Sequence, residues 1–481
     1  MFFRKTTYQY FTTAILFFVC IVCYAFFQSA YIFIIPFVWI LFPFAFDFCV
    51  KRTHELFWLL IVALPLSTEL NITSSLGIDF PDEFIMIILT GLVLVKILHQ
   101  PTFFPNELIK EPLFLLLCCM MGWTFISACF ADNTTLSLKF FLARIWFIIP
   151  FVVMPQILLQ SQSSIKKFAL LLLIPMGLIV MQVLVRQAFY GFSFVDIKKA
   201  MNPFFRNHVN YSSMLVCLLA PAIAMRFLTN SQNKYQRWLT VAILIGFVAL
   251  FFSYSRGAWV ALLVGLVFAL LMKWGWVKKI IAISLMVVIG ASTWLVVDHH
   301  FMRFAPDHDH TIFHTDFSEH IAATVTLKDV SNAERFYRWV AGYRMFVERP
   351  VTGFGPNNFY STYRPYTINA FQTWVSDNPE HSTIHNYFLL TLAEQGIPGL
   401  LLFAMLWIGI LFRLQYLYKH LQNEFYRTVT LCVAVVLAMI VSINFMSDMI
   451  ETDKIGSLFW LCLGFVFIIN RKFAEEYRSI A

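Results

Sequence analysis

Apolar segments of roughly 15 to 25 residues, each about long enough to cross a ~30 Å hydrocarbon layer as a helix, recur from end to end of the chain. Lipid offers no partners to backbone N–H and C=O groups, so such segments must satisfy these groups internally, as α-helices do. Of the 481 residues, 59% are hydrophobic and only 13% are charged, which is too apolar for an ordinary soluble protein. The chain is therefore predicted to be an all-α, polytopic transmembrane helical bundle.

We predict about 12 to 14 spans from the apolar segments. The candidate spans lie at residues 8–27, 30–49, 55–68, 83–98, 113–130, 138–159, 168–189, 211–228, 238–254, 257–273, 279–298, 385–412, 428–447 and 456–470. The first segment follows Arg4 and Lys5 as a signal peptide would, but another span follows at once, so we expect an uncleaved first helix.

The spans divide the chain into four parts. N-terminal transmembrane helices at 1–200 are followed by central transmembrane helices with a Ser-Arg-Gly turn at 201–298. A long polar loop, expected to contain short helices, occupies 299–384, and C-terminal transmembrane helices occupy 385–481. The long loop contains tryptophan, tyrosine and turn residues and is not of low complexity, so we expect it to be folded.

The distribution of charge predicts the orientation of the chain. If the N-terminus is cytoplasmic, most of the 35 lysines and arginines fall in inner loops or at the chain ends. The loop at 69–83 contains no lysine or arginine but four carboxylates, as an outer loop should: Glu69, Asp79, Asp82 and Glu83. Both termini are then cytoplasmic and the loop at 299–384 is outside. This topology accounts for most of the net charge of +8 without a nucleic acid partner.

Cysteine and histidine usage predicts neither disulfides nor a metal site. All nine cysteines lie in or beside apolar segments, and none is in the long loop. The run from Asp307 to His310, with His314, has metal-ligating residue types but lacks the spacing of a defined site. We therefore expect no metal and no other cofactor.

Some basic residues break the charge rule because they lie on the outer side. Five of them stand at or near the outer ends of spans: Lys139, Arg144, Arg186, Arg206 and Arg256. A cation at the membrane edge is costly unless it snorkels to water or meets an anion. Snorkelling explains any single one of them, whereas five on the same side favour an anionic ligand.

Arg256 stands in a turn between two spans, where Ser255 could cap the next helix and Gly257 would allow a ligand close approach. A helix N-terminus together with a guanidinium forms a phosphate site that needs no metal. The alternative is a helix cap with an interfacial arginine.

The long loop contains a second candidate site. The segment from Ser331 to Glu334 has the pattern of a capping box and predicts a helix to about Arg349, ended by Pro350. Two arginines three residues apart would share one face of this helix, which could bind a diphosphate or could simply be solvated: Arg335 and Arg338.

His385 lies where the polar loop re-enters the membrane. A neutral imidazole there can take a proton from a hydroxyl nucleophile, although interfacial histidines often serve only as anchors. Glu394 would lie ~13 Å deeper on a helix, and the break at Gly396 to Gly399 indicates a bent helix that lines a cavity. We expect Glu394 to be an orienting carboxylate rather than a base, and we assign Asn386 an orienting role as well.

An ordered set of four motifs resembles the O-antigen ligase family, which also includes O-antigen polymerases and protein O-oligosaccharyltransferases. The motifs are Arg206-Asn207-His208-Val209-Asn210, Tyr254 to Trp259, Glu348 to Gly355, and His385 to Gly396. The resemblance covers about residues 200–415. The ordered set is more specific than any one motif.

The resemblance implies a metal-independent, inverting glycosyltransferase of the bacterial inner membrane. Its donor would be a glycan on undecaprenyl diphosphate, used at the periplasmic face, and its leading acceptor the lipid A-core. His385 would activate the acceptor hydroxyl and Arg256 would be the second catalytic residue. The residues implied to bind diphosphate or glycan are Arg206, Arg335, Arg338, Arg144 and Arg186.

Three alternatives to O-antigen ligation remain open. An O-antigen polymerase or a protein O-oligosaccharyltransferase would differ in the acceptor. A flippase or transporter for the same lipid-linked sugar would also need cations, but it predicts two pseudo-symmetric halves and charges at the membrane midplane, which the sequence does not show.

Overall fold

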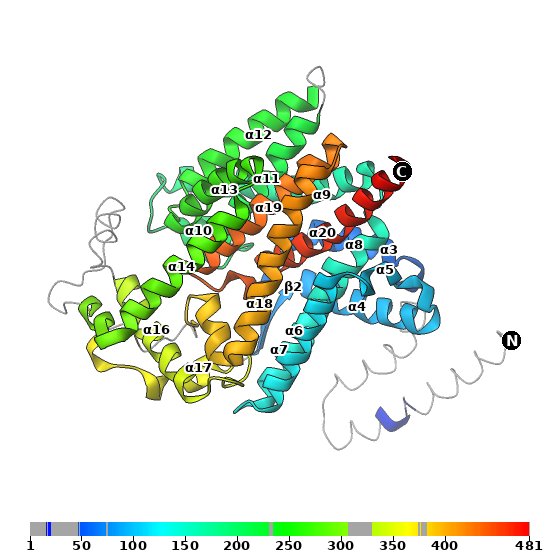
Figure 1. Cartoon of the computed structure of the whole chain (residues 1–481). Helices are drawn as coiled ribbons and strands as arrows, with labels where there is room; N and C mark the ends of the chain where they lie inside the picture. The colour runs from blue at the N-terminus through cyan, green and yellow to red at the C-terminus, as the bar shows by residue number, and fades with distance from the viewer. Residues whose placement is uncertain are drawn as a thin grey trace.

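The computed structural model describes residues 49–73, 76–229, 234–305, 330–373 and 382–480, with residues 16, 18–20, 47 and 376. This part of the chain is a bundle of α-helices with one small β-hairpin (Figure 1). Nine of the described helical segments are long and apolar enough to cross a membrane, by length and composition. The predicted all-α polytopic bundle is confirmed.

The nine candidate spans agree with the segments expected from the sequence. They are α6 (Pro112–Cys129), α7 (Thr134–Ile148) continued by η3 (Ile149–Val153) and α8 (Met154–Leu158), α9 (Gln162–Phe189), α11 (His208–Leu228), α13 (Arg256–Trp274), α14 (Val277–Val296) continued by η4 (Val297–Phe304), α18 (Tyr387–His420), α19 (Glu424–Asn444) and α20 (Asp453–Ile480).

Three further helices coincide with expected spans: α3 (Thr53–Leu66), α4 (Asp82–His99) and α12 (Lys234–Phe251). Short elements join the spans: η2 (Pro101–Phe103), α5 (Asn106–Ile109), α10 (Ile197–Met201) and η7 (Met449–Glu451). Apart from a few isolated positions, the expected spans at 8–27 and 30–49 lie outside the described residues. So does the run from Asp307 to His310 with His314.

Polar side chains at the helix starts explain several boundaries. The Asn207 carboxamide accepts a hydrogen bond of 2.9 Å from the backbone N–H of Asn210 at the start of α11. Ser161 forms a capping box at the start of α9. At the other end of a helix, Gly275 has φ +76° and ends α13, a conformation that glycine adopts without strain.

The helices differ strongly in burial. The apolar window of α20 is 94% buried inside the protein, whereas that of α14 is only 6% buried. A helix that is apolar and buried all round lies at the centre of a bundle, and an apolar helix exposed all round faces lipid. Around α20, the helix α19 packs against α11, α13 and α18, and α6 packs against α18.

The long loop forms short helices, as expected. Its helix α16 (Val330–Glu348) agrees with the predicted start and end to within about one residue. It is followed by α17 (Phe359–Thr362), η5 (Arg364–Tyr366) and η6 (Asn369–Phe371). Figure 1 shows α16 and α17 at one end of the bundle and the C-terminal end of α20 at the other. We call these the loop end and the opposite end.

Helix α18 is broken at Gly396, and part of the long loop packs against the break. Gly396 has φ +68° inside the helix, and the backbone N–H of Ile397 donates a 2.9 Å hydrogen bond to the Pro350 carbonyl. A Cβ at Gly396 would collide with the Val351 carbonyl. The backbone N–H of Gly355 donates to the Glu394 carbonyl at 2.8 Å. The helix breaks where predicted, and the 350–355 turn of the long loop packs against this break.

The same turn is tied to the connection between α6 and α7. Ser137 donates a 2.7 Å hydrogen bond to the Pro356 carbonyl. The Asn358 side chain accepts a 3.0 Å hydrogen bond from the backbone N–H of Asn133, and Arg349 pairs with Asp132 at 2.7 Å. These bonds hold the long loop on the bundle at a fixed place.

The β-hairpin is a feature that the sequence did not predict. Strands β1 (Thr68–Thr73) and β2 (Leu76–Phe80) pair antiparallel, with Glu69 opposite Asp79. The hairpin occupies most of the acidic loop at 69–83 and leads directly into α4.

Candidate functional site

His385 occupies a tight turn immediately before α18. Its backbone has φ +54°, a left-handed conformation that is uncommon for residues other than glycine. The next residue, Asn386, caps α18, since its side chain accepts a 3.0 Å hydrogen bond from the backbone N–H of Leu389. The turn and the cap together fix the position from which the imidazole projects.

The partner of His385 is Asp448, in the connection between α19 and α20. Nδ1 of His385 lies 3.7 Å from Oδ1 of Asp448, and the side chains are 34% and 15% exposed. The other carboxylate oxygen accepts a hydrogen bond from the Thr383 hydroxyl. The imidazole is thus accessible while the carboxylate behind it is held in place.

The electrostatics of Asp448 favour its charged form. Burial alone would raise the pKa of this carboxyl group, but its interactions with His385 and Thr383 outweigh burial and hold the pKa below its usual value. A charged carboxylate next to an imidazole stabilises the protonated ring and orients it. An imidazole that is oriented by a carboxylate can act as a general base.

Arg338 supports the chain segment that precedes His385. Its Nη1 donates a 3.3 Å hydrogen bond to the Thr383 carbonyl, and its Nη2 lies 3.2 Å from Oε2 of Glu334. Both side chains are buried. Glu334, expected to close a capping box, accepts hydrogen bonds from Thr373 and Ser376 as well as from Arg338. Arg338 therefore contacts protein groups, and Arg335, one turn away, is the more exposed of the two loop arginines.

Arg144 is buried in the bundle below His385. It pairs with Glu451, and its Nη2 donates a 3.2 Å hydrogen bond to the Tyr387 hydroxyl. Its guanidinium also lies over the Phe140 ring, 4.5 Å from the centroid. Arg144 thus connects the first residue of α18 to the connection that contains Asp448, and it faces protein rather than the outer surface.

Glu394 is a buried carboxylate that holds backbone amides. Its two oxygens accept 2.9 Å hydrogen bonds from the N–H groups of Asn357 and Phe359. These residues belong to the long loop, so Glu394 fixes the loop against α18 just before the break at Gly396. This geometry fits an orienting role.

Arg256 is the first residue of α13. Ser255 stands at the N-cap position, but its side chain makes no capping hydrogen bond, so the predicted serine cap is wrong. The turn is instead held by Tyr254, whose hydroxyl donates a 2.5 Å hydrogen bond to the Phe192 carbonyl, and by Trp259, whose Nε1 donates to the Leu250 carbonyl at 3.0 Å. Arg256 itself is half-exposed at the N-terminus of the helix.

Arg256 and His385 lie at the same end of the bundle. A Cβ on Gly275, which ends α13, would collide with Nζ of Lys419 in the last turn of α18. The C-terminal ends of α13 and α18 therefore meet at the opposite end, and both helices start toward the loop end.

A cleft of about 740 Å³ opens between the hairpin, the 198–206 segment and the start of α20. Arg206 lines it and lies 3.7 Å from Glu69. Asn202 also lines it, and its carbonyl accepts a hydrogen bond from Arg186. The remaining charged groups that line the cleft are Lys198, Lys454, Asp79, Glu83, Glu451 and Asp453. The cleft therefore holds more carboxylates than cations.

The sequence-based search missed the acidic partners at this end of the bundle. Asp448 and Glu451 both belong to the short polar run between the last two expected spans. The sequence pattern had indicated only cations on the outer side. A short outer loop rich in carboxylates beside the expected position of His385 is the signal that points to this segment.

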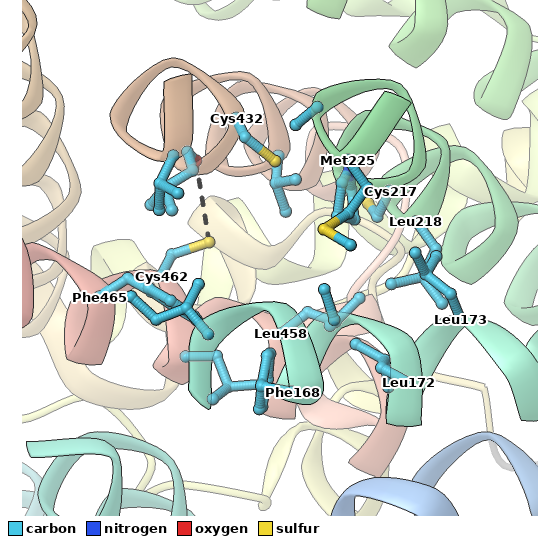
Figure 2. Close-up of a pocket in the computed structure, with 18 of the residues that line it drawn as sticks. Phe168, Leu172, Leu173, Cys217, Leu218, Met225, Cys432, Leu458, Cys462 and Phe465 are labelled. Atoms are coloured by element: carbon cyan, nitrogen blue, oxygen red, sulfur yellow. Dashed lines mark hydrogen bonds between the residues drawn. The ribbon is translucent and has the colours of Figure 1, made fainter. Parts of the chain in front are cut away.

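An apolar crevice lies between α9, α11, α19 and α20 and is shown in Figure 2. Its labelled lining includes Phe168, Leu172, Cys217, Cys462 and Phe465, and none of the described residues that line it is charged. The Cys462 thiol points to the Val433 carbonyl at 3.9 Å. A diphosphate would find no cation there, so this crevice is not the candidate site.

One comparison with known proteins gives a family match. Residues 241–404, about a third of the chain, match a family model described as O-antigen ligase. The matched segment includes Arg256, the described part of the long loop, His385 and Glu394. The comparison with curated proteins gives no match.

The fold defines a polytopic helical membrane protein. The resemblance to the O-antigen ligase family is confirmed by the family match. The match supports an O-antigen ligase-like membrane glycosyltransferase that acts on a lipid-linked glycan and an acceptor.

Proposed function

We propose that the protein transfers a polysaccharide from undecaprenyl diphosphate to an acceptor hydroxyl at the periplasmic face of the inner membrane, and that the acceptor is the lipid A-core. The observation that carries the proposal is the pairing of His385 with Asp448 at the loop end, where Arg256 also starts α13. An accessible imidazole backed by a carboxylate supplies a base, and outer arginines supply the countercharge for a diphosphate.

In the proposed reaction His385 acts as the general base. The imidazole nitrogen that faces away from Asp448 takes the proton of the acceptor hydroxyl as its oxygen attacks the anomeric carbon. The bond from that carbon to the diphosphate oxygen breaks, and the diphosphate leaves with the electron pair. A single displacement of this kind inverts the anomeric configuration. Asp448 stabilises the imidazolium that forms.

The leaving diphosphate needs positive charge at the moment of bond cleavage. Arg256, at the N-terminus of α13, combines a guanidinium with the positive end of a helix dipole. Arg335 is the second candidate because it is partly exposed on α16. Guanidinium groups can supply this charge without a metal ion, which is why we propose a metal-independent reaction.

The other predicted arginines receive different roles. We propose that Arg338 and Arg144, which contact Glu334 and Glu451, position the His385 turn and do not touch the diphosphate. Arg206 lines the acid-rich cleft, and Arg186 donates to the carbonyl of Asn202, which also lines it. Carboxylates accept hydrogen bonds from hydroxyl groups, so this cleft suits the sugars of a glycan or of the acceptor better than it suits a diphosphate.

The experiment that tests this function is a gel of lipopolysaccharide from a strain that lacks the protein, complemented with wild type, Arg256→Ala or His385→Ala at equal protein levels. Arg237→Ala, an exposed arginine near the start of α12, is the matched control. We expect the wild type and the control to give a ladder of glycan on lipid A-core. Both site variants should accumulate full-length lipid-linked glycan without a ladder.

Two outcomes would contradict the proposed ligation and indicate another function. Short undecaprenyl-linked units in the site variants would indicate an O-antigen polymerase, because the defect would then lie in chain extension. An unchanged lipopolysaccharide ladder with glycan missing from proteins would indicate a protein O-oligosaccharyltransferase.

A further inference from the structure

A second polar cleft, of about 750 Å³, lies at the opposite end of the bundle from His385. It is formed by the starts of α6 and α14, the last turns of α18 and one residue of α20. Three cations line it, one from α14 and two from α18: Lys278, Arg413 and Lys419. The positive-inside rule explains why such residues occur at this end, but it does not explain why they converge on one cleft.

Few carboxylates of the described chain lie near these three cations. In the described part of the chain, neither Lys278 nor Lys419 has a carboxylate within ion-pair distance. Arg413 donates through Nε to Asn470 at 2.7 Å, and Asn470 donates in turn to Glu111 at 3.0 Å. Among the described residues, Glu111 is the one carboxylate that lines the cleft. The cleft thus carries excess positive charge.

A buried donor in the same cleft points to an acceptor-rich ligand. Gln415 lines the cleft and is only 6% exposed, and its Nε2 has no hydrogen-bond partner among the described residues. An unpartnered buried amide donor costs free energy unless a ligand or water satisfies it. A phosphate oxygen can accept from Gln415 and from the neighbouring cations at once.

The surroundings of the cleft are those of a membrane interface. Trp274 and Trp276, on either side of Gly275, are 59% and 50% exposed, and their rings are 5.6 Å apart. Exposed tryptophans mark the level of the lipid headgroups. The adjoining helix α14 has an almost wholly exposed apolar surface. The cleft therefore lies where a headgroup meets the protein and where acyl chains can follow α14.

We propose that this cleft binds the headgroup of an anionic phospholipid from the membrane leaflet at the end of the bundle opposite to His385. The phosphate contacts Lys278, Lys419 and the terminal nitrogens of Arg413, and Gln415 donates to a phosphate oxygen. The acyl chains lie along Phe412 and the exposed face of α14. Basic clefts between transmembrane helices recognise lipid phosphates in this way. The inference does not depend on the proposed transferase function.

The test is native mass spectrometry of the full-length protein in nanodiscs that contain phosphatidylglycerol and phosphatidylcholine. The wild type should retain one tightly bound phosphatidylglycerol. The variant Lys278→Gln/Arg413→Gln/Lys419→Gln should bind it at least about tenfold more weakly, because it removes the three positive charges that attract the lipid phosphate. A matched variant removes the same charge outside the cleft: Lys110→Gln/Lys167→Gln/Arg427→Gln.

A second variant keeps the test valid if the triple substitution impairs folding. Gln415→Leu removes the unpartnered donor and keeps the side-chain size, so it should weaken lipid binding severalfold without lowering the thermal midpoint. Equal retention of phosphatidylglycerol in the cleft and matched variants would overturn the proposal. So would displacement of the bound lipid by millimolar inorganic phosphate, which would identify the ligand as a free anion.

Discussion

Nδ1 of His385 lies 3.7 Å from Oδ1 of Asp448, although the two residues belong to different interhelical connections. The Thr383 hydroxyl of the first connection also donates to Asp448, and the N–H of Tyr387, the first residue of α18, donates a 3.1 Å hydrogen bond to the Ser447 carbonyl. The position of the imidazole therefore depends on residues from both connections. Each of these contacts can be altered separately.

Replacement of Asp448 should lower turnover more than it lowers binding. Asp448→Asn keeps the shape but loses the charge that stabilises the protonated imidazole, so we expect kcat to fall by about 10- to 100-fold, less than loss of a general base itself. The pKa of Asp448 is below its usual value, so the carboxylate is charged at neutral pH and the effect should persist from about pH 6 to 8. Donor KM should change less than about threefold.

The control for Asp448 is Thr383→Val, which removes the hydroxyl that donates to the carboxylate but leaves its charge. It should reduce kcat less than Asp448→Asn does. Wild-type turnover in Asp448→Asn would rule out a positioning role for this carboxylate.

Loss of Arg338 should destabilise the loop end. Arg338→Gln leaves the Glu334 carboxylate buried without its cation, which costs about 3 kcal/mol in comparable buried pairs. We expect a lower thermal midpoint and a lower kcat, and partial recovery of the midpoint in Arg338→Gln/Glu334→Gln, where the buried charge is removed as well.

The matched control is Arg344→Gln on the same helix, because Arg344 is exposed and, among the described residues, its hydrogen bonds are to the carbonyls of Tyr366 and Thr367 at 3.4 Å. Arg344→Gln should leave the thermal midpoint and kcat near the wild-type values. If the double variant is no more stable than Arg338→Gln, the pair is not the reason for the stability loss.

The contribution of Glu394 to stability should depend on how many acceptor oxygens its side chain offers to the backbone N–H groups of the long loop. Glu394→Ala leaves the buried N–H groups of Asn357 and Phe359 without partners, which should cost about 2 to 4 kcal/mol. Glu394→Gln keeps one acceptor oxygen and should cost less. Thermal unfolding in detergent measures the order, with the exposed Glu475→Ala as the control. Equal midpoints for the Ala and Gln variants would contradict this account.

Asp79 should make the protein less stable as pH rises. Burial raises its pKa, Glu69 adds to the effect, and Lys454 opposes it. The native state then binds more protons than the unfolded chain between the usual and the raised pKa, so the free energy of unfolding falls as pH rises through this window. Thermal midpoints at about pH 4, near the usual pKa of an aspartate, and at about pH 8 should differ less in Asp79→Asn than in wild type. Identical differences would exclude a contribution from Asp79.

Much of the bundle could be predicted from the sequence because lipid imposes one rule on every span. The expected spans from 55–68 onward all coincide with helices, and the capping and proline pattern placed α16 closely. The β-hairpin was not predicted, since Glu69 faces Asp79 through backbone pairing that no hydrophobic period signals.

The candidate site was harder to predict because it depends on tertiary partners. Sequence reasoning selected His385, Arg256 and Glu394 by their positions near span ends. It treated Arg144 and Arg338 as possible ligand contacts. Arg338 and Glu334 are four residues apart on α16, and their burial, rather than their proximity, is what the sequence does not show. The pair of Arg144 with Glu451 forms only when distant segments of the chain are packed together. Asp448 was missed for the same reason.

The central claim is that His385 takes the proton of the acceptor hydroxyl during glycan transfer. It is tested most directly with purified protein in liposomes that contain a glycan on undecaprenyl diphosphate and lipid A-core. Wild type and His99→Ala, an exposed histidine at the end of α4, should form glycan-bearing lipid A. His385→Ala should lose at least about 100-fold in rate with an unchanged thermal midpoint. Product formation by His385→Ala at the wild-type rate would contradict the account.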